Sequence, residues 1–134
     1  MSGPWSERAH AVIYVVDDNE AVRNGLKLLL EVNGFCAAAF ASGSDLLAAI
    51  RADAGTTVAG CLLLDLHLPG LNGAELQERL RAKGLEIPTI LMTGQPHGPQ
   101  AARARAAGVT EIMPKPIDGT ALLTTIHQLL PRPD

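Results

Sequence analysis

Five polar side chains in this sequence follow short runs of aliphatic residues. Asp17 and Asp18 come directly after Ile-Tyr-Val-Val, and Asp65 comes directly after Cys-Leu-Leu-Leu. Thr93 follows Thr-Ile-Leu-Met, and Lys115 stands just beyond Glu-Ile-Met. Neighbouring carboxylates repel one another unless a cation neutralises them, and hard oxygen ligands of this kind suit Mg²⁺. The pattern predicts a magnesium site in which Lys115 supplies a second, fixed positive charge.

Among the three aspartates, Asp65 is the best candidate for a nucleophile. It stands alone after its aliphatic run, whereas Asp17 and Asp18 form a pair whose mutual repulsion favours metal ligation. A carboxylate beside a divalent ion, an ammonium group and a hydroxyl donor is equipped to attack a phosphoryl group, because that transition state is stabilised mainly by positioning and charge neutralisation. We therefore expect Asp65 to react with a phosphoryl group beside Thr93 and Lys115.

An alternation of strands and helices must position these side chains. Short aliphatic runs predict strands, and the longer segments between them have helical spacing. The predicted strands cover 11–16, 36–40, 60–64, 89–92 and 110–113, and the predicted helices cover about 20–33, 42–52, 74–83, 99–108 and 118–130. With right-handed crossovers, this is an α/β fold: a flavodoxin-like, doubly wound parallel sheet in the order 2-1-3-4-5. Such sheets bind ligands at the carboxyl ends of their strands, where the polar residues stand.

The predicted helices differ in how much apolar surface they offer. In the first helix, four residues form the stripe that should face the core: Val22, Leu26, Leu29 and Leu30. The helix over 74–83 has only Leu76 and Leu80 as a clear stripe, so we expect it to be largely exposed. In the last helix, Asp118 is the predicted N-cap.

Composition limits the classes of protein that fit. The chain has 134 residues, 47% hydrophobic and only 3% aromatic, which predicts one domain with an aliphatic core. Its net charge of -3, with signs scattered along the chain, argues against direct binding of nucleic acid. No apolar run approaches the roughly 20 residues that span a bilayer, and no secretion signal is present, so we expect a cytoplasmic protein without a membrane partner.

The two cysteines are not expected to form a disulfide. Cys36 and Cys61 fall on strands that flank the first strand on opposite sides, about 9–10 Å apart. That separation exceeds what a disulfide can bridge. Both are therefore predicted to be small apolar residues of the core.

Four motifs of this chain together resemble the receiver domain of two-component response regulators. They are VVDDNEAVRNGLKLLLEVNGF, LLLDLHLPGLNG, ILMTG and MPKPID, in the family's order and spacing, over about 12–130. The resemblance implies that Asp65 accepts a phosphoryl group from a phosphohistidine on a sensor histidine kinase or a histidine phosphotransfer protein. It implies that Asp18, Asp65 and the backbone carbonyl of His67 bind Mg²⁺, or Mn²⁺ in its place, with Asp17 helping through water.

The same resemblance implies roles for the remaining site residues. Thr93 would bind the phosphoryl oxygen and move with it, and Lys115 would pair with the phosphoryl group before a cis Lys115-Pro116 bond. Receivers usually carry Tyr or Phe three residues before the lysine, as part of the switch, and here that position is Ile112. We therefore expect signalling to rely more on residues 93–99 and the following helix. His67 and Gln95 occupy positions that influence the lifetime of the phosphoryl group.

Three other hypotheses give the same residues different roles. A phosphohydrolase of the haloacid-dehalogenase type would need an acid two residues after the nucleophile, where this chain has His67. A degenerate receiver that only binds partners is supported by Ile112 alone. A flavodoxin would need a Ser/Thr/Gly-rich phosphate loop after the first strand, where Asp17 and Asp18 would repel its anion. We therefore expect a phosphoacceptor switch that catalyses only its own phosphotransfer and autodephosphorylation.

The predicted domain occupies residues 11–130, with a flexible leader over 1–10 and a tail or linker start over 131–134. The protein is expected to act either alone or as the receiver part of a longer regulator, including a transcriptional one. A homodimer that forms on phosphorylation is a further expected interaction.

Overall fold

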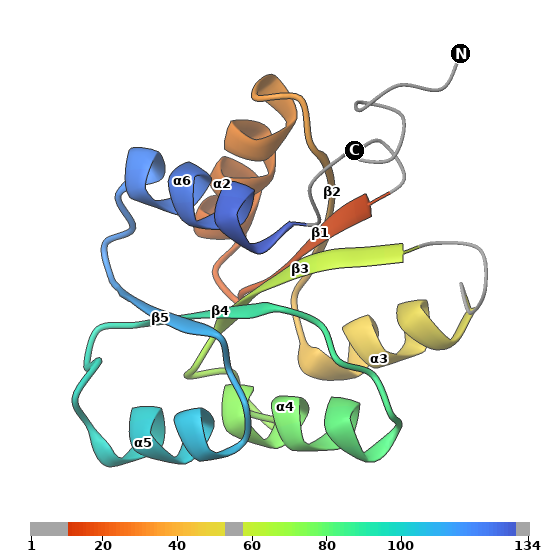
Figure 1. Cartoon of the computed structure of the whole chain (residues 1–134), viewed down its shortest axis with the longest axis vertical. Coiled ribbons are helices and arrows are strands. Elements are labelled where there is room, and N and C mark those ends of the chain that lie inside the picture. The colour runs from red at the N-terminus through yellow and green to blue at the C-terminus, as the bar shows by residue number, and fades with distance from the viewer. Residues whose placement is uncertain (1–10, 53–57, 131–134) are drawn as a thin grey trace.

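The computed structural model describes residues 11–52 and 58–130, which form an α/β fold around one parallel sheet (Figure 1). Its strands are β1 (Ala11–Val16), β2 (Cys36–Phe40), β3 (Val58–Asp65), β4 (Thr89–Thr93) and β5 (Glu111–Pro114). They pair in parallel in the order β2-β1-β3-β4-β5, so the predicted flavodoxin-like topology is confirmed. The predicted leader, the predicted tail and residues 53–57 lie outside the described residues.

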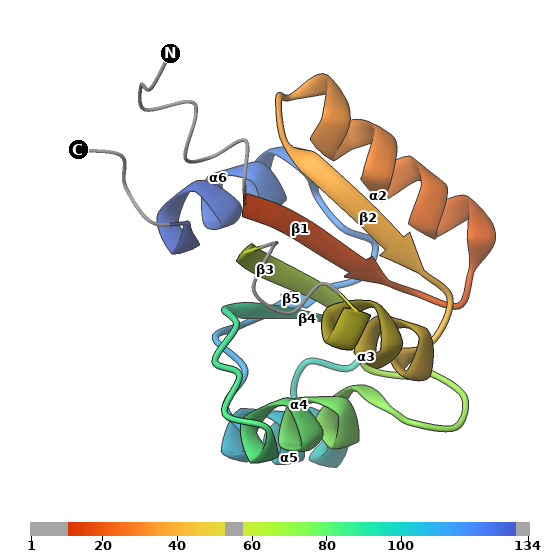
Figure 2. The ribbon, with the colours of Figure 1, turned by 90° about the vertical axis from the view of Figure 1, so that its right-hand side faces the viewer.

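Helices cover both faces of the sheet (Figures 1 and 2). The helices are α2 (Glu20–Val32), α3 (Gly43–Ala52), α4 (Gly73–Ala82), α5 (Pro99–Ala106) and α6 (Gly119–Leu129). Helices α2 and α6 lie on one face, and α3, α4 and α5 lie on the other (Figure 1). None of these described helices is long and apolar enough to cross a membrane.

Two mainly aliphatic cores fill the space between the sheet and the helices. Successive side chains of a strand point to opposite faces, so Ile13 and Val15 join the core under α2 and α6, whereas Tyr14 and Val16 join the core above α3, α4 and α5. Central strands of a parallel sheet are buried on both faces, which explains why they appear in the sequence as continuous aliphatic runs.

Side chains at the starts of the helices fix where the chain leaves the sheet. Asn19 caps α2, Asp118 caps α6, and Asn72 forms a capping box with Glu75 at the start of α4. Ser42 accepts a hydrogen bond from the backbone N–H of the third residue after it, as the sequence predicts for the start of α3. These caps hold the loops that follow the carboxyl ends of the strands.

Two predictions about helix burial are wrong. Val22 is 37% exposed, although Leu26 and Leu30 are buried as predicted. Each step of four residues overshoots one helical turn by about 40°. Two such steps separate Val22 from Leu30, so Val22 lies about 80° around the helix from Leu30. Helix α4 is not largely exposed, because Gln77 is buried there in addition to its apolar residues. The prediction missed Gln77 because it considered only aliphatic side chains.

The prediction for the cysteines is correct for one of them. Cys61 is fully buried in β3, and neither cysteine forms a disulfide. Cys36 is exposed, contrary to the prediction, because it opens the edge strand β2, whose side chains are covered only in part. Burial raises the pKa of the Cys61 thiol from 9.0 to about 12.

Candidate functional site

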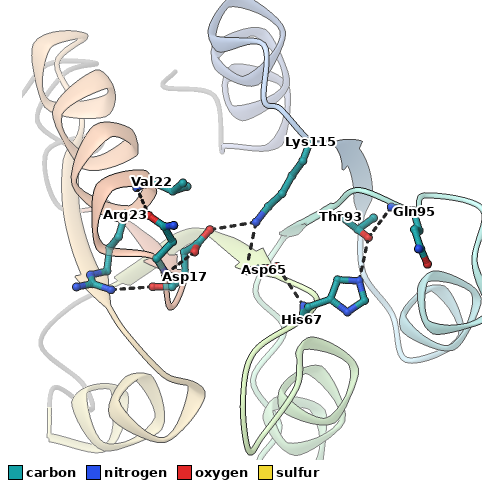
Figure 3. Close-up of polar contacts among 9 residues, drawn as sticks. Asp17, Val22, Arg23, Asp65, His67, Thr93, Gln95 and Lys115 are labelled. Carbon is teal, nitrogen blue, oxygen red and sulfur yellow. Dashed lines mark hydrogen bonds and ion pairs between the residues drawn. The ribbon is translucent and has the colours of Figure 1, made fainter.

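The predicted site residues meet at the carboxyl edge of the sheet, where β1, β3, β4 and β5 end (Figure 3). Asp17 follows β1, Asp65 ends β3, Thr93 ends β4, and Lys115 follows β5. The aspartates and the threonine are buried, at 0%, 5% and 0% exposed respectively. Parallel strands bring these ends together although the residues are far apart in the sequence.

The three aspartates form an acidic cluster. Asp17, Asp18 and Asp65 each offer a carboxylate oxygen, and these oxygens all lie within 4.8 Å of one another. Asp18 is exposed, so the cluster is open to solvent on one side. Carboxylates this close repel one another, and one divalent cation bound to all three would remove that repulsion. The donor set therefore fits Mg²⁺, which prefers oxygen ligands and retains waters at its remaining positions.

Two hydrogen bonds from the loop after β1 and from α2 hold Asp17 in place. The backbone N–H of Asn19 donates to Asp17 Oδ1 at 2.9 Å, and Arg23 Nη1 donates to the backbone carbonyl of Asp17 at 2.9 Å. No local pattern in the sequence indicates this contact of Arg23. The carboxylate of Asp17 is thus fixed beside that of Asp65 before any ion binds.

Lys115 neutralises part of the acidic cluster. Its Nζ lies 3.2 Å from Asp65 Oδ2 and 3.4 Å from Asp17 Oδ2 (Figure 3). Its backbone N–H donates to the carbonyl of Thr93 at 2.9 Å, and the peptide bond to Pro116 is cis, as expected. Partial burial alone lowers the pKa of this ammonium group, but the charges of Asp65 and Asp17 outweigh burial and raise the pKa above its ordinary value. Lys115 therefore stays positively charged beside the carboxylates.

The hydroxyl of Thr93 lies across the site from Asp17. Its Oγ1 accepts a hydrogen bond from the backbone N–H of Gln95 at 3.0 Å and lies 3.5 Å from His67 Nε2 (Figure 3). The backbone N–H of His67 donates to Asp65 Oδ1 at 3.1 Å. The loops after β3 and β4 thus contact each other beside the acidic cluster.

Gly73 permits a close approach that sequence reasoning did not single out. Its backbone N–H donates to the carbonyl of Leu66 at 3.1 Å. A Cβ atom at this position would lie 3.0 Å from Leu66 Cα and 3.1 Å from the carbonyl oxygen of Asp65. The start of α4 is therefore in close contact with the end of β3, which carries Asp65.

Ile112 lies away from the polar cluster. It is half-buried in β5, opposite Leu91 of β4, and packs against the core above α3, α4 and α5. Gln95 is exposed and contributes its backbone N–H to the site. The structure thus brings together the predicted acids, hydroxyl and lysine, and it leaves residue 112 on the side of the sheet that faces α5.

A family model matches most of this chain. The model of the response regulator receiver domain matches residues 13–127 of the chain. This chain belongs to that family. The matched region contains all three aspartates, Thr93 and Lys115.

Relatives of this chain include a transcriptional regulatory protein and a response regulator protein. The chain is 34% identical over 121 residues to the transcriptional regulatory protein FixJ of Azorhizobium caulinodans, covering 90% of this chain and 55% of that protein. It is 34% identical over 125 residues to the response regulator protein TodT of Pseudomonas putida, covering 93% of this chain and 53% of that protein. The chain spans about half the length of these relatives.

Several solved structures have the same fold. The response regulator StyR has a TM-score of 0.78 and 40% identity, over 90% of this chain and 59% of that one. FixJ-N has a TM-score of 0.78 and 32% identity, over 89% of this chain and 92% of that one. The Vibrio cholerae chemotaxis protein CheY4, with a TM-score of 0.80 and 22% identity over 90% of this chain and 98% of that one, shares the fold. The chain is a receiver domain of two-component response regulators.

Proposed function

We propose that this receiver domain accepts a phosphoryl group on Asp65 from a sensor histidine kinase or a histidine phosphotransfer protein. A carboxylate oxygen of Asp65 attacks the phosphorus of a phosphohistidine, the P–N bond breaks, and the imidazole leaves. One observation carries the proposal: the buried Asp65 lies 3.2 Å from the Lys115 ammonium, and its carboxylate lies within 4.8 Å of two further carboxylates. A nucleophile beside both a fixed cation and a metal-binding pair suits phosphoryl transfer.

Asp17, Asp18 and Asp65 would hold Mg²⁺ or Mn²⁺, together with the backbone carbonyl of His67. The bound ion supplies positive charge that offsets the negative charge of the phosphoryl group. The fixed position of Asp17, which accepts from Asn19 and lies beside Lys115, supports this assignment. Both the ion and Lys115 would then balance the roughly two to three negative charges that meet at Asp65 during transfer.

In the phosphorylated protein, Thr93 and Lys115 bind the phosphoryl group on Asp65. The Lys115 ammonium pairs with one phosphoryl oxygen, and the Thr93 hydroxyl turns to donate a hydrogen bond to another. That turn takes Oγ1 away from the N–H of Gln95, to which it is bonded at 3.0 Å. His67 and Gln95 flank the phosphoryl group and influence how long it survives attack by water.

The change at Thr93 passes to the surface through the loop before α5. The Arg105 side chain of α5 donates to the carbonyl of Pro96 at 3.3 Å, and Gly98 donates to the carbonyl of Gln95 at 3.0 Å. Ile112 lacks the polar tip of an aromatic switch residue, so we propose that this loop and α5 carry most of the signal. The signal alters partner binding or dimerisation, in a cytoplasmic protein that acts alone or within a longer, transcriptional regulator.

Incubation with a small acyl phosphate tests the proposal. Intact-mass spectrometry should detect one added phosphoryl group on the wild-type protein when Mg²⁺ is present and none when the ion is chelated. Asp65→Asn should abolish the modification. Asp45→Asn, which changes an exposed aspartate in the first turn of α3, is the matched control and should be modified like the wild type. Modification of Asp65→Asn at the wild-type level would refute the proposal, and turnover of a small phosphoester would favour a hydrolase.

A further inference from the structure

His67 contacts both the proposed phosphoacceptor and the proposed switch residue (Figure 3). Its backbone N–H donates to Asp65 Oδ1 at 3.1 Å, and its ring Nε2 lies 3.5 Å from Thr93 Oγ1. The residue itself is exposed, whereas Thr93 is completely buried. The imidazole therefore covers the buried hydroxyl from the solvent side of the loop after β3.

The hydroxyl proton of Thr93 needs an acceptor in this arrangement. The N–H of Gln95 donates to Oγ1 at 3.0 Å, so that contact uses a lone pair of the oxygen and leaves its proton available to donate. Buried polar groups are rarely left without a partner, because an unmade hydrogen bond is costly there. Nε2 of His67 can accept this proton when the ring carries its own proton on Nδ1.

We infer that the His67 imidazole is a latch: a positioning residue that holds the Thr93 hydroxyl in its resting orientation and so opposes activation. The inference rests on the proposed function of Asp65. Thr93 has one hydroxyl proton, and it cannot donate that proton both to Nε2 of His67 and to a phosphoryl oxygen on Asp65. A group that binds only the resting state shifts the equilibrium toward that state.

Release of the latch should also loosen the loop before α5. When Oγ1 turns toward Asp65, the N–H of Gln95 loses its acceptor. The next two contacts in this loop, from Gly98 to Gln95 and from Arg105 to Pro96, connect it to α5. His67 thus sets the energetic threshold that phosphorylation must exceed before the change reaches α5.

Beryllofluoride, a mimic of the phosphoryl group, tests the latch by a double-mutant cycle. With Mg²⁺ present, His67→Leu should bind beryllofluoride about two- to tenfold more tightly than the wild type, as expected for loss of one hydrogen bond that opposes binding. In a Thr93→Val background, His67→Leu should change the affinity by less than about 1.5-fold. His67→Gln, whose amide oxygen can accept the proton, should restore wild-type affinity. The control His97→Leu changes an exposed histidine of the loop before α5 and should have no effect.

Other outcomes would overturn the inference. The latch requires the hydroxyl of Thr93. If His67→Leu still binds beryllofluoride more tightly in the Thr93→Val background, His67 acts on the phosphoryl group directly and not through Thr93. No change, or weaker binding, in His67→Leu means that no latch exists. If the wild-type protein does not bind beryllofluoride at all, the proposed function fails, and the latch fails with it. The Thr93 methyl resonance of the unliganded protein is a second readout, and it should move in His67→Leu but not in His97→Leu.

Discussion

Gly73→Ala should destabilise the protein, although glycine to alanine substitutions in helices usually have the opposite effect. The added Cβ would lie 3.0 Å from Leu66 Cα, 3.1 Å from the carbonyl oxygen of Asp65 and 3.1 Å from Leu91 Cδ1. Two of these neighbours are backbone atoms, which cannot turn aside. Overpacking of this kind costs about 1–3 kcal/mol, whereas alanine gains at most about 1 kcal/mol in helix propensity. We expect the free energy of unfolding to fall by about 1–2 kcal/mol.

Gly25→Ala is the matched control for that prediction. Gly25 lies inside α2, and apart from the adjoining backbone of its own helix a Cβ there would meet no atom within 4 Å. This substitution should raise the free energy of unfolding by about 0.5–1 kcal/mol. Urea unfolding followed by circular dichroism measures both changes, and an unchanged m-value would show that the unfolding reaction is the same. If Gly73→Ala has the same free energy of unfolding as the wild type, a Cβ atom fits between α4 and the end of β3, and the expected steric clash is refuted.

Three further predictions concern charge and burial. Asp18→Asn should raise the free energy of unfolding of the metal-free protein by about 1 kcal/mol, because carboxylates within 4.8 Å repel one another even near solvent. It should also abolish the rise in melting temperature that Mg²⁺ causes, and an undiminished rise would contradict metal binding by the acidic cluster. The pKa of Lys115 is raised in the folded protein, so the ammonium group stabilises the fold fully below pH 10.5 and stops doing so as the pH rises through the folded pKa. The metal-free wild type should therefore lose more of its free energy of unfolding above pH 10.5 than Lys115→Met, and parallel pH profiles of the two proteins would contradict this. Iodoacetamide at mildly alkaline pH should label exposed Cys36 but not Cys61, whose pKa is raised to about 12, and equal labelling of the native protein would contradict the burial of Cys61.

The sequence predicts the fold and the members of the site because both depend on strand ends. In a parallel sheet, the residue after each strand reaches the same edge, so Asp17, Asp65 and Lys115 must approach one another once the strands are recognised. The aliphatic runs that mark the strands are strong signals, since central strands are buried on both faces. The roles of these residues in phosphotransfer stay predictions.

Contacts between distant side chains could not be predicted. Gln77 is buried because its amide bonds to Thr89 and to the carbonyl of Gly108, residues that no local pattern links to it. The ring of His67 reaches Thr93 across 26 positions of sequence. Residues of this kind are placed by packing of the complete fold, so only the structure identifies them.

Direct localisation of the phosphoryl group tests the central claim. Reduction with borohydride converts a phosphorylated aspartate to homoserine, and peptide sequencing by tandem mass spectrometry then identifies the position. After treatment with a small acyl phosphate and Mg²⁺, we predict homoserine at position 65. Conversion at Asp17 or Asp18 instead, or an acid-labile phosphoryl group on His67 with Asp65 unmodified, would contradict the account.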